Sequence, residues 1–192
     1  MATAGPNLAG TGADDATVGT RTWINTGNIT ANDGSYTSTS VAINSSTNSS
    51  HYLKATNFSF SIPSGATIDG ITVVFRRMAT PIPAKDSFIK IIKGGTIGST
   101  SLHSGTNWDG TGFRSDTYGG ASNLWGESWT DTDINSSAFG VALSCFSSSF
   151  KSTTTPRVDY VEITINYTSG GASFIARRNP LSKQAVNRAS TF

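Results

Sequence analysis

The chain has 192 residues, a formal net charge of +2 and only 14% charged residues. This length fits one domain with a sizeable core and leaves no room for two well-formed enzyme domains. Serine and threonine together number 55 and glycine 20, a composition typical of short strands and many turns. The small net charge gives no general attraction to nucleic acid or to a membrane.

The charge is divided unevenly along the chain. Residues 1–167 carry 10 Lys and Arg against 12 Asp and Glu, a balance of −2, whereas residues 168–192 carry four basic residues and no acid. A segment with so few large apolar groups buries too little surface to offset its ordering entropy. We therefore expect residues 168–192 to form a basic C-terminal arm that gains order only against a partner.

The first half of the chain contains four segments with strand character. Residues 1–20 are small, Gly-rich and without a hydrophobic period, which indicates an N-terminal arm ahead of a folded domain at residues 21–167. Turn residues then separate alternating segments, which is the pattern of β-strands. The predicted strands are Tyr36–Ile43, Tyr52–Ile62, Ile68–Met78 and Asp86–Lys93, the last two joined by a Pro81-Ile82-Pro83 loop.

The second half contains the clearest alternation after a turn-rich middle. Gly94–Trp129 is divided by glycines and its register is poorly specified, while Phe139–Cys145 and Val161–Tyr167 alternate cleanly and belong at the centre of packed sheets. About eight strands and no convincing helix before residue 168 predict a two-sheet antiparallel β-sandwich. A jelly roll is favoured over an immunoglobulin fold because the Cys…Trp…Cys arrangement is missing.

The C-terminal arm has a helix signal of its own. Thr168–Gly171 reads as a flexible linker, and Asn179-Pro180 provides an N-cap and first-turn pair for a short helix at residues 180–188. A nine-residue helix is marginal alone in water, so we expect it to form on docking.

Four stretches in fixed order carry a resemblance. Ile62–Val73, Leu124–Thr130, Phe139–Leu143 and Val158–Tyr167 together resemble a jelly-roll-like domain that recurs in structural proteins of tailed bacteriophages and in phage-derived gene clusters. The likeness covers roughly residues 20–168 and leaves the basic arm unexplained. It implies a virion protein that serves as capsid decoration (cement), head fibre or tail component, and it carries over no catalytic residue.

The sequence offers no coherent catalytic or metal-binding set. His51 and His103 have no recognisable nucleophile beside them, and Cys145 lies in an apolar run that indicates a buried thiol. Three Cys and His residues, widely scattered, exclude structural zinc. Glu127, Asp131 and Asp133 could contribute to a calcium site, although turn and capping roles are commoner for Asp. We therefore expect no enzyme activity, no cofactor and no metal.

Aromatic and arginine residues leave two alternatives open. Core or interface packing is the first interpretation of the aromatic residues in the loop-rich middle, and stacking on sugars is the second. These residues are Trp108, Tyr118, Trp125 and Trp129. Adjacent Arg76 and Arg77 should point to opposite faces of their strand, so that one guanidinium pairs with Asp or Glu inside or at an interface.

The expected function is that of a non-enzymatic structural virion protein. The most favoured role is capsid decoration, in which the arms bind the major capsid protein or other virion subunits through Arg177, Arg178, Leu181, Lys183, Arg188 and Phe192. We expect a homo-oligomer, with a trimer as one option, and no membrane or nucleic-acid partner. Because the N-terminus lacks a signal-peptide pattern, the chain should be made in the host cytoplasm. A decoration role would place it on the capsid exterior. The alternative is a tail, fibre or carbohydrate-binding module that recognises a receptor or glycan.

Overall fold

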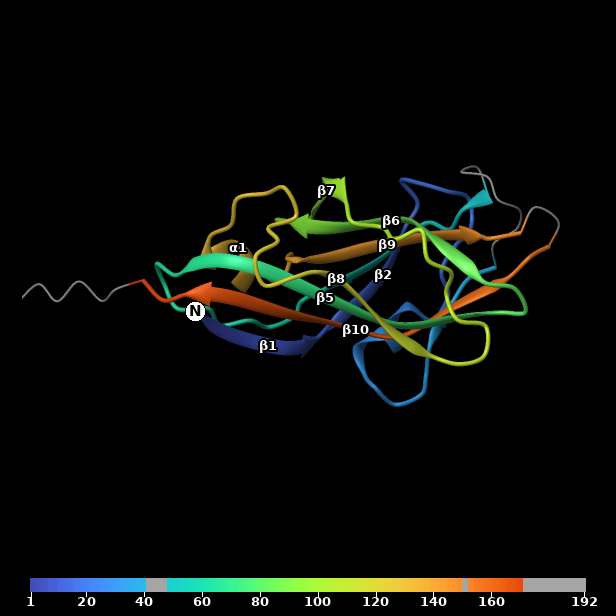
Figure 1. Cartoon of the computed structure of the whole chain (residues 1–192), viewed down its shortest axis with the longest axis horizontal. Coiled ribbons are helices and arrows are strands. Elements are labelled where there is room, and N and C mark those ends of the chain that lie inside the picture. The colour runs from blue at the N-terminus through green and yellow to red at the C-terminus, as the bar shows by residue number, and fades with distance from the viewer. Residues whose placement is uncertain (41–47, 150–151, 171–192) are drawn as a thin grey trace, which may run out of the picture.

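The computed structural model describes residues 1–40, 48–149 and 152–170, which form two packed antiparallel sheets (Figure 1). The first sheet has the order β1-β10-β5-β8, with β3 also beside β10, and the second has the order β2-β4-β9-β6-β7. The first sheet consists of β1 (Ala2–Leu8), β3 (Thr37–Ser38), β5 (Thr67–Thr80), β8 (Arg114–Gly119) and β10 (Thr155–Thr168). The second consists of β2 (Thr11–Asp15), β4 (Tyr52–Thr56), β6 (Ala84–Lys93), β7 (Thr96–Ser101) and β9 (Gly140–Ser147).

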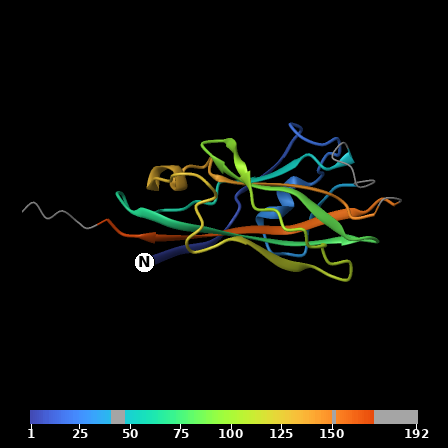
Figure 2. The same cartoon turned by 45° about the horizontal axis from the view of Figure 1, so that its top comes forward.

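The predicted all-β, two-sheet antiparallel sandwich is confirmed, and its winding is jelly-roll-like. Successive strands pass from one sheet to the other at each step along the chain, with the exception of the β6–β7 hairpin. Figure 2 shows the two layers, with β1, β5, β8 and β10 in one of them. The two edge strands β7 and β8 therefore lie on the same lateral side of the sandwich, joined by residues 102–113.

The core lies between the sheets and follows the period-2 pattern of the strands. Ile71, Val73 and Phe75 of β5 are fully buried, as are Ile89 and Ile91 of β6. Each such side chain contributes on the order of 1.5–3 kcal/mol through burial. The central strands β9 and β10, predicted from their clean alternation, supply the same kind of inward face with Val141, Leu143, Val161 and Ile163.

The N-terminal segment is part of the sandwich, which corrects the expectation of an arm at residues 1–20. β1 pairs with β10 from Ala2 to Leu8, and β2 pairs with β4 from Thr11 to Asp15. Ala9 donates from its amide to Val161 O at 3.0 Å as the chain passes from one sheet to the other. These strands are held by backbone pairing at sheet edges, so small residues suffice and no hydrophobic period marks them in the sequence.

The predicted strand Tyr52–Ile62 is shorter in the structure. β4 ends at Thr56, because Asn57 and Ser59 have φ values of 61° and 54° that interrupt the strand, although Phe58 and Phe60 remain buried. The loop at Pro81–Pro83 joins β5 and β6 as expected and connects the two sheets.

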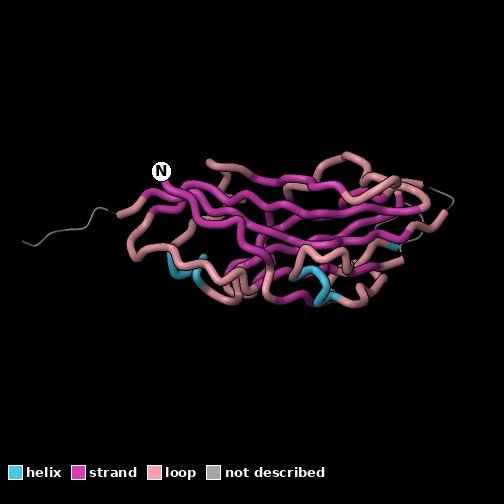
Figure 3. Tube along the Cα trace, turned by 90° about the horizontal axis from the view of Figure 1, so that it is seen from below, coloured by secondary structure: helices cyan, strands magenta, loops and turns pink. Residues whose placement is uncertain are grey.

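Short helical segments occur before residue 168 in the described part of the chain, where none was expected. α1 (Asp131–Asn135) begins with a capping box between Thr130 and Asp133, and Thr26–Thr30 forms a 3-10 turn. Figure 3 shows both at the periphery of the sheets. No helix in the described ranges is long and apolar enough to cross a membrane. The predicted strand end at residues 41–43 and the predicted helix at residues 180–188 lie outside the described residues.

Candidate functional site

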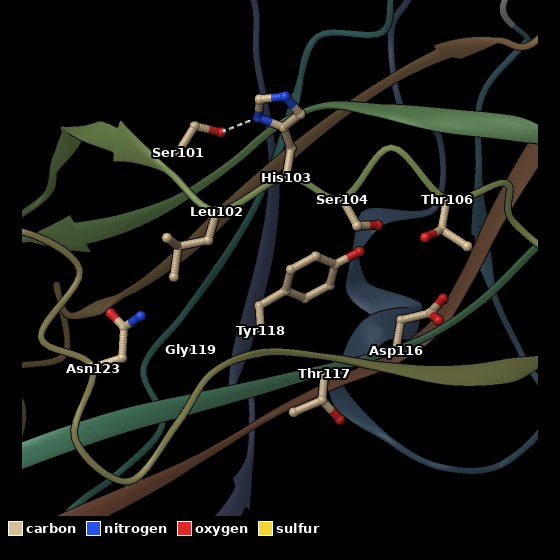
Figure 4. A pocket seen from close by; sticks show the side chains of 10 residues that line it. All are labelled: Ser101, Leu102, His103, Ser104, Thr106, Asp116, Thr117, Tyr118, Gly119 and Asn123. Atoms are coloured by element: carbon tan, nitrogen blue, oxygen red, sulfur yellow. Dashed lines mark hydrogen bonds between the residues drawn. The ribbon is translucent and has the colours of Figure 1, made fainter.

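A groove of about 560 Å³ opens between the edge strands β7 and β8. One wall is the segment that leaves β7, and the other is β8 with the turn that follows it (Figure 4). The lining is predominantly polar and consists of Ser101, Leu102, His103, Ser104, Thr106, Asp116, Thr117, Tyr118, Gly119 and Asn123. The groove is therefore built from the two strands whose register the sequence left unspecified.

The loop between β7 and β8 is tied to the sandwich along its length. Leu102 and Trp108 donate backbone hydrogen bonds to Ile89 O and Ala84 O, both at 2.9 Å, and Ala79 N donates to Asp109 O at 2.9 Å. Asp109 turns the chain by accepting from the amide and hydroxyl of Thr111, each at 2.6 Å. These bonds from Thr111 lower the pKa of Asp109 to about 2, with a further contribution from Arg114.

A buried charge network lies beneath the groove. Arg77 of β5 donates from Nη1 to Asp86 of β6 and from Nε to Asp116 of β8, the second bond at 2.8 Å. Its Nη2 donates to Tyr118 Oη, which in turn donates to Asp86 Oδ2 at 2.7 Å. Trp108 Nε1 donates to Asp86 Oδ1 at 2.8 Å. The side chains of Arg77 and Asp86 are 1% and 0% exposed, so this ion pair is shielded from water. It links β5 of one sheet to β6 of the other and, through Trp108, to the β7–β8 loop.

The network also fixes the groove wall directly. Ser104, which lines the groove, donates from both its amide and its hydroxyl to Asp86 Oδ2 at 3.2 Å. Asp86 therefore positions the loop on one side of the groove and Tyr118 on the other. Truncating one partner of such a pair leaves an uncompensated buried charge, which is far more costly than losing an exposed ion pair.

The buried charges shift two pKa values in ways that preserve the network. Burial, the largest single effect, lowers the pKa of the Arg77 guanidinium, but the charge of Asp86 and the hydrogen bonds to Asp86 and Asp116 together outweigh it. The net pKa is raised, so Arg77 stays charged. Burial raises the pKa of the Tyr118 phenol, and the negative charge of Asp86 adds to that rise. Tyr118 is thus held as the neutral phenol and keeps its proton for the bond to Asp86.

A β-bulge turns Asp86 toward the interior. Asp86 is opposite Cys145 and Phe88 is opposite Ser144, so Ser87 is an extra residue in β6. Inward Ile89 and Ile91 set an alternation that would place Asp86 on the outer face, and a one-residue insertion reverses the face. The bulge is the reason that this carboxylate reaches Arg77. The two adjacent arginines point to opposite faces of β5, as expected. Arg77 pairs with Asp86 in the interior, and Arg76 pairs with Asp159 at 3.0 Å on the other face.

Several polar groups remain available to a ligand. Asp116 engages Arg77 through Oδ2, and its Oδ1 has no partner among the described residues. The side chain of Asn123 accepts a hydrogen bond from Trp125 N through Oδ1 at 2.8 Å. Its side-chain nitrogen, Nδ2, has no partner among the described residues. His103 contacts Ser101 Oγ through Nδ1 at 3.3 Å, and its other ring nitrogen has no hydrogen-bond partner among the described residues.

The aromatic residues considered for sugar stacking occupy different positions. Trp108 and Trp125 are each 1% exposed and belong to the core cluster, so neither ring offers an open face to a sugar. Tyr118 is 5% exposed and forms the floor of the groove. Trp129 is partly buried between Phe139, at 5.4 Å between ring centroids, and the ammonium of Lys93. The interpretation of these rings as core packing is supported, because the loops bearing Trp108 and Trp125 fold inward over the ends of the sheets.

The other candidate residues have structural partners. His51 contacts Asp14 Oδ2 through Nδ1 at 2.8 Å, and Asp14 also accepts from the amide of Trp23. Cys145 is fully buried, as predicted, and burial raises the pKa of its thiol to about 12. Asp133 caps α1 and pairs with Lys93 at 3.4 Å. No group of three or more potential metal ligands occurs within residues 1–40, 48–149 and 152–170.

The residues proposed for the assembly arm cannot be placed. Arg177, Arg178, Leu181, Lys183, Arg188 and Phe192 all lie outside the described residues. Thr168, predicted to open the linker, is the last residue of β10, and its hydroxyl donates to Asp69 at 2.7 Å.

Comparison with known proteins gives a fold neighbour and no family. No family model and no curated protein matches the chain. A solved structure titled "CBM4 structure and function" is similar over 69% of this chain and 85% of its own chain, with 11% sequence identity and a TM-score of 0.40. At this level of similarity the comparison concerns the β-sandwich fold alone.

Sequence reasoning missed most of the groove. Ser101, Ser104, Thr106 and Asn123 look like ordinary turn residues in the sequence. Among the lining residues, Tyr118 was considered for ligand binding and His103 only for catalysis. The one available signal was a carboxylate, Asp116, two residues before Tyr118 and therefore on the same face of a strand. The rest depends on two sheet edges meeting in space, which no local pattern encodes.

Proposed function

We propose that the chain is a non-catalytic binding module and that the groove between β7 and β8 is its saccharide-binding site. The observation that carries this proposal is a polar groove whose two walls are fixed to one buried carboxylate, Asp86, through Ser104 and Tyr118. A site that is formed before the ligand arrives loses little conformational entropy on binding.

The lining of the groove is chemically matched to a sugar. Sugar hydroxyls both donate and accept hydrogen bonds, and Thr106, Asn123 and Asp116 offer a hydroxyl, an amide and a carboxylate for them. Leu102 and the small exposed part of the Tyr118 ring, which is 5% exposed, add a minor apolar surface. A small number of precisely placed polar groups is what fixes the orientation of a small ligand.

Two candidate reactive side chains, Cys145 and His51, do not line the groove and give no support to catalysis there. Cys145, with the pKa of its thiol raised to about 12, is a buried thiol and a poor nucleophile. The ring of His51 is held by Asp14 of β2.

A saccharide panel tests the proposal. The whole chain is titrated by calorimetry with neutral, amino and acidic oligosaccharides, beside Thr106→Trp, which fills the groove, and Ser115→Ala, which changes an exposed residue of β8 outside the lining. We expect at least one sugar to bind the natural chain and Ser115→Ala equally and to lose binding to Thr106→Trp. Binding that persists in Thr106→Trp, or no binding of any sugar at millimolar concentration, contradicts the proposal.

A second candidate is a structural virion protein, most specifically a capsid decoration or cement protein. It is favoured by the resemblance to phage structural domains and by the segregation of four basic residues, Arg177, Arg178, Lys183 and Arg188, into the C-terminal segment. In this proposal the sandwich is a rigid block, and the basic segment pairs with acidic groups on the major capsid protein or another virion subunit. The two proposals are compatible, since a particle-bound module can also recognise a glycan.

The test of this second candidate is a truncation that spares β10. A chain ending at Gly170 retains every strand of the described residues, β1 to β10. It should fold and no longer attach to purified particles, whereas full occupancy of the particles by the truncated chain contradicts the arm mechanism.

A further inference from the structure

The groove carries a negative charge that is only partly used. Asp116 is the only carboxylate in the lining, and no lysine or arginine of the described residues lines the groove. Its side chain is 38% exposed, and only Oδ2 is engaged, by Arg77 Nε at 2.8 Å. One carboxylate oxygen therefore faces the groove with its acceptor capacity free.

Arg77 does not cancel this charge at the groove surface. Its side chain is 1% exposed, and its three nitrogens are directed to Asp86, Tyr118 and Asp116. The network holds one positive charge, Arg77, against two negative charges, Asp86 and Asp116, which leaves a net charge of −1. That charge resides on the partly exposed carboxylate because Asp86 is enclosed.

The polar groups are arranged unequally along the groove. Figure 4 shows Asp116 and Thr106 at one end, Leu102 and Asn123 at the other, and Tyr118 between them. The first end offers acceptors, whereas Asn123 offers an amide donor at the second. A ligand with a cationic donor at one end and neutral hydroxyls at the other would match both ends.

We infer that the groove selects a saccharide bearing a positively charged amino group, and that Asp116 Oδ1 is the acceptor for that group. The inference rests on the proposed saccharide binding and names its ligand class. A hydrogen bond between charged groups is stronger than a neutral one, and an anionic sugar is repelled by the same carboxylate. The preference over a neutral sugar should be roughly fivefold or more, and it should shrink as salt is added.

The experiment compares three matched trisaccharides by calorimetry at pH 6.5 and at two salt concentrations. The probes are the trimers of glucosamine, N-acetylglucosamine and galacturonic acid, which are cationic, neutral and anionic. On the natural chain we expect the glucosamine trimer to bind most tightly and the galacturonic acid trimer least. Asp116→Asn keeps an acceptor for Arg77 Nε and removes the charge, so it should lose the preference and keep its unfolding temperature within a few degrees.

A second variant keeps the test decisive if Asp116→Asn does not fold. Thr106→Lys places a positive charge on an exposed residue at the same end of the groove and should shift the preference toward the anionic trimer. Equal or tighter binding of the neutral trimer by the natural chain, or no change of preference in either variant, overturns this inference and leaves saccharide binding intact. Failure of all three trimers and of the wider panel instead overturns the proposed function itself.

Discussion

The guanidinium of Arg77 lies over the indole ring of Trp108, with 4.3 Å between Arg77 Cζ and the ring centroid. Both side chains also hydrogen-bond to the same carboxylate, Asp86. A cation stacked on a ring inside the protein is stabilised by the ring as well as by its counter-ion. This arrangement connects β5, β6 and the β7–β8 loop at one point, and the groove lies directly above it.

Removing the central carboxylate should destabilise the whole domain. Asp86→Asn leaves the Arg77 guanidinium buried with only the partly exposed Asp116 as a counter-ion, so we expect a loss of about 3–5 kcal/mol in the free energy of unfolding. Urea denaturation measures it. Asp69→Asn, at an exposed hydrogen bond with Thr168, is the matched control and should change stability by no more than about 0.5 kcal/mol. A change of similar size in both variants would show that the network does not stabilise the fold.

The buried thiol should make the fold sensitive to alkali. The pKa of Cys145 is raised by burial from 9.0 to about 12, so an unfolded chain loses the thiol proton at lower pH than the folded chain. Its contribution to stability is complete below pH 9 and is lost as the pH rises toward 12, at up to about 1.4 kcal/mol per pH unit.

Cys145→Ser isolates that contribution, because serine does not titrate in this range. The unfolding free energy of this variant, followed by denaturant titration between pH 8 and 11, should fall less steeply with rising pH than that of the natural chain. Tyr118, whose pKa is also raised, is present in both chains and therefore does not affect the comparison. Parallel slopes for the two chains would contradict the assigned burial of the thiol.

The N-terminal strands should be required for stability. Deleting residues 1–8 removes β1 and uncovers the edge of β10 from Glu162 to Tyr167, so we expect a loss of about 3 kcal/mol or more, roughly 10 °C in Tm. Thermal unfolding followed by circular dichroism measures the change, and the chain ending at Gly170 is the control. An unchanged Tm after the N-terminal deletion would restore the interpretation of residues 1–20 as an arm.

The turn at the end of β8 should tolerate only glycine. Gly119 has a φ of 75°, and a Cβ there would lie 2.2 Å from Ile71 O, so Gly119→Ala should cost more than about 1 kcal/mol. Gly105, in the loop between the lining residues Ser104 and Thr106, has open space where a Cβ would lie, and Gly105→Ala should be neutral or slightly stabilising. Equal unfolding midpoints for the two variants in urea would be inconsistent with this backbone geometry.

The sequence predicted the fold where side chains alternate between core and solvent. β5, β9 and β10 were found close to their true positions because their apolar residues recur with period 2. β1 and β2 were missed because edge strands of Ala, Gly, Thr and Asn pair through the backbone, and their small side chains leave no pattern. β7 and β8 were missed for a similar reason, as glycines and polar residues dominate both strands.

The site was less predictable than the fold. Pairing of one of the two adjacent arginines followed from strand geometry, but its partner Asp86 did not, because the bulge at Ser87 reverses the face expected from Ile89 and Ile91. Core or interface packing was the first interpretation of Trp108, and the ring is buried. The partner of its indole nitrogen was not predictable, because the alternation had placed the Asp86 carboxylate outside.

The measurement that tests the central claim most directly is an NMR titration of the 15N-labelled chain with the oligosaccharide that binds most tightly in the panel. Saturable shifts of backbone amides should concentrate at residues 101–106 and 116–123, on both walls of the groove, with little change along β1 or β4. Shifts confined to other surfaces, or no saturable shifts at all, would contradict the assignment of the β7–β8 groove as the binding site.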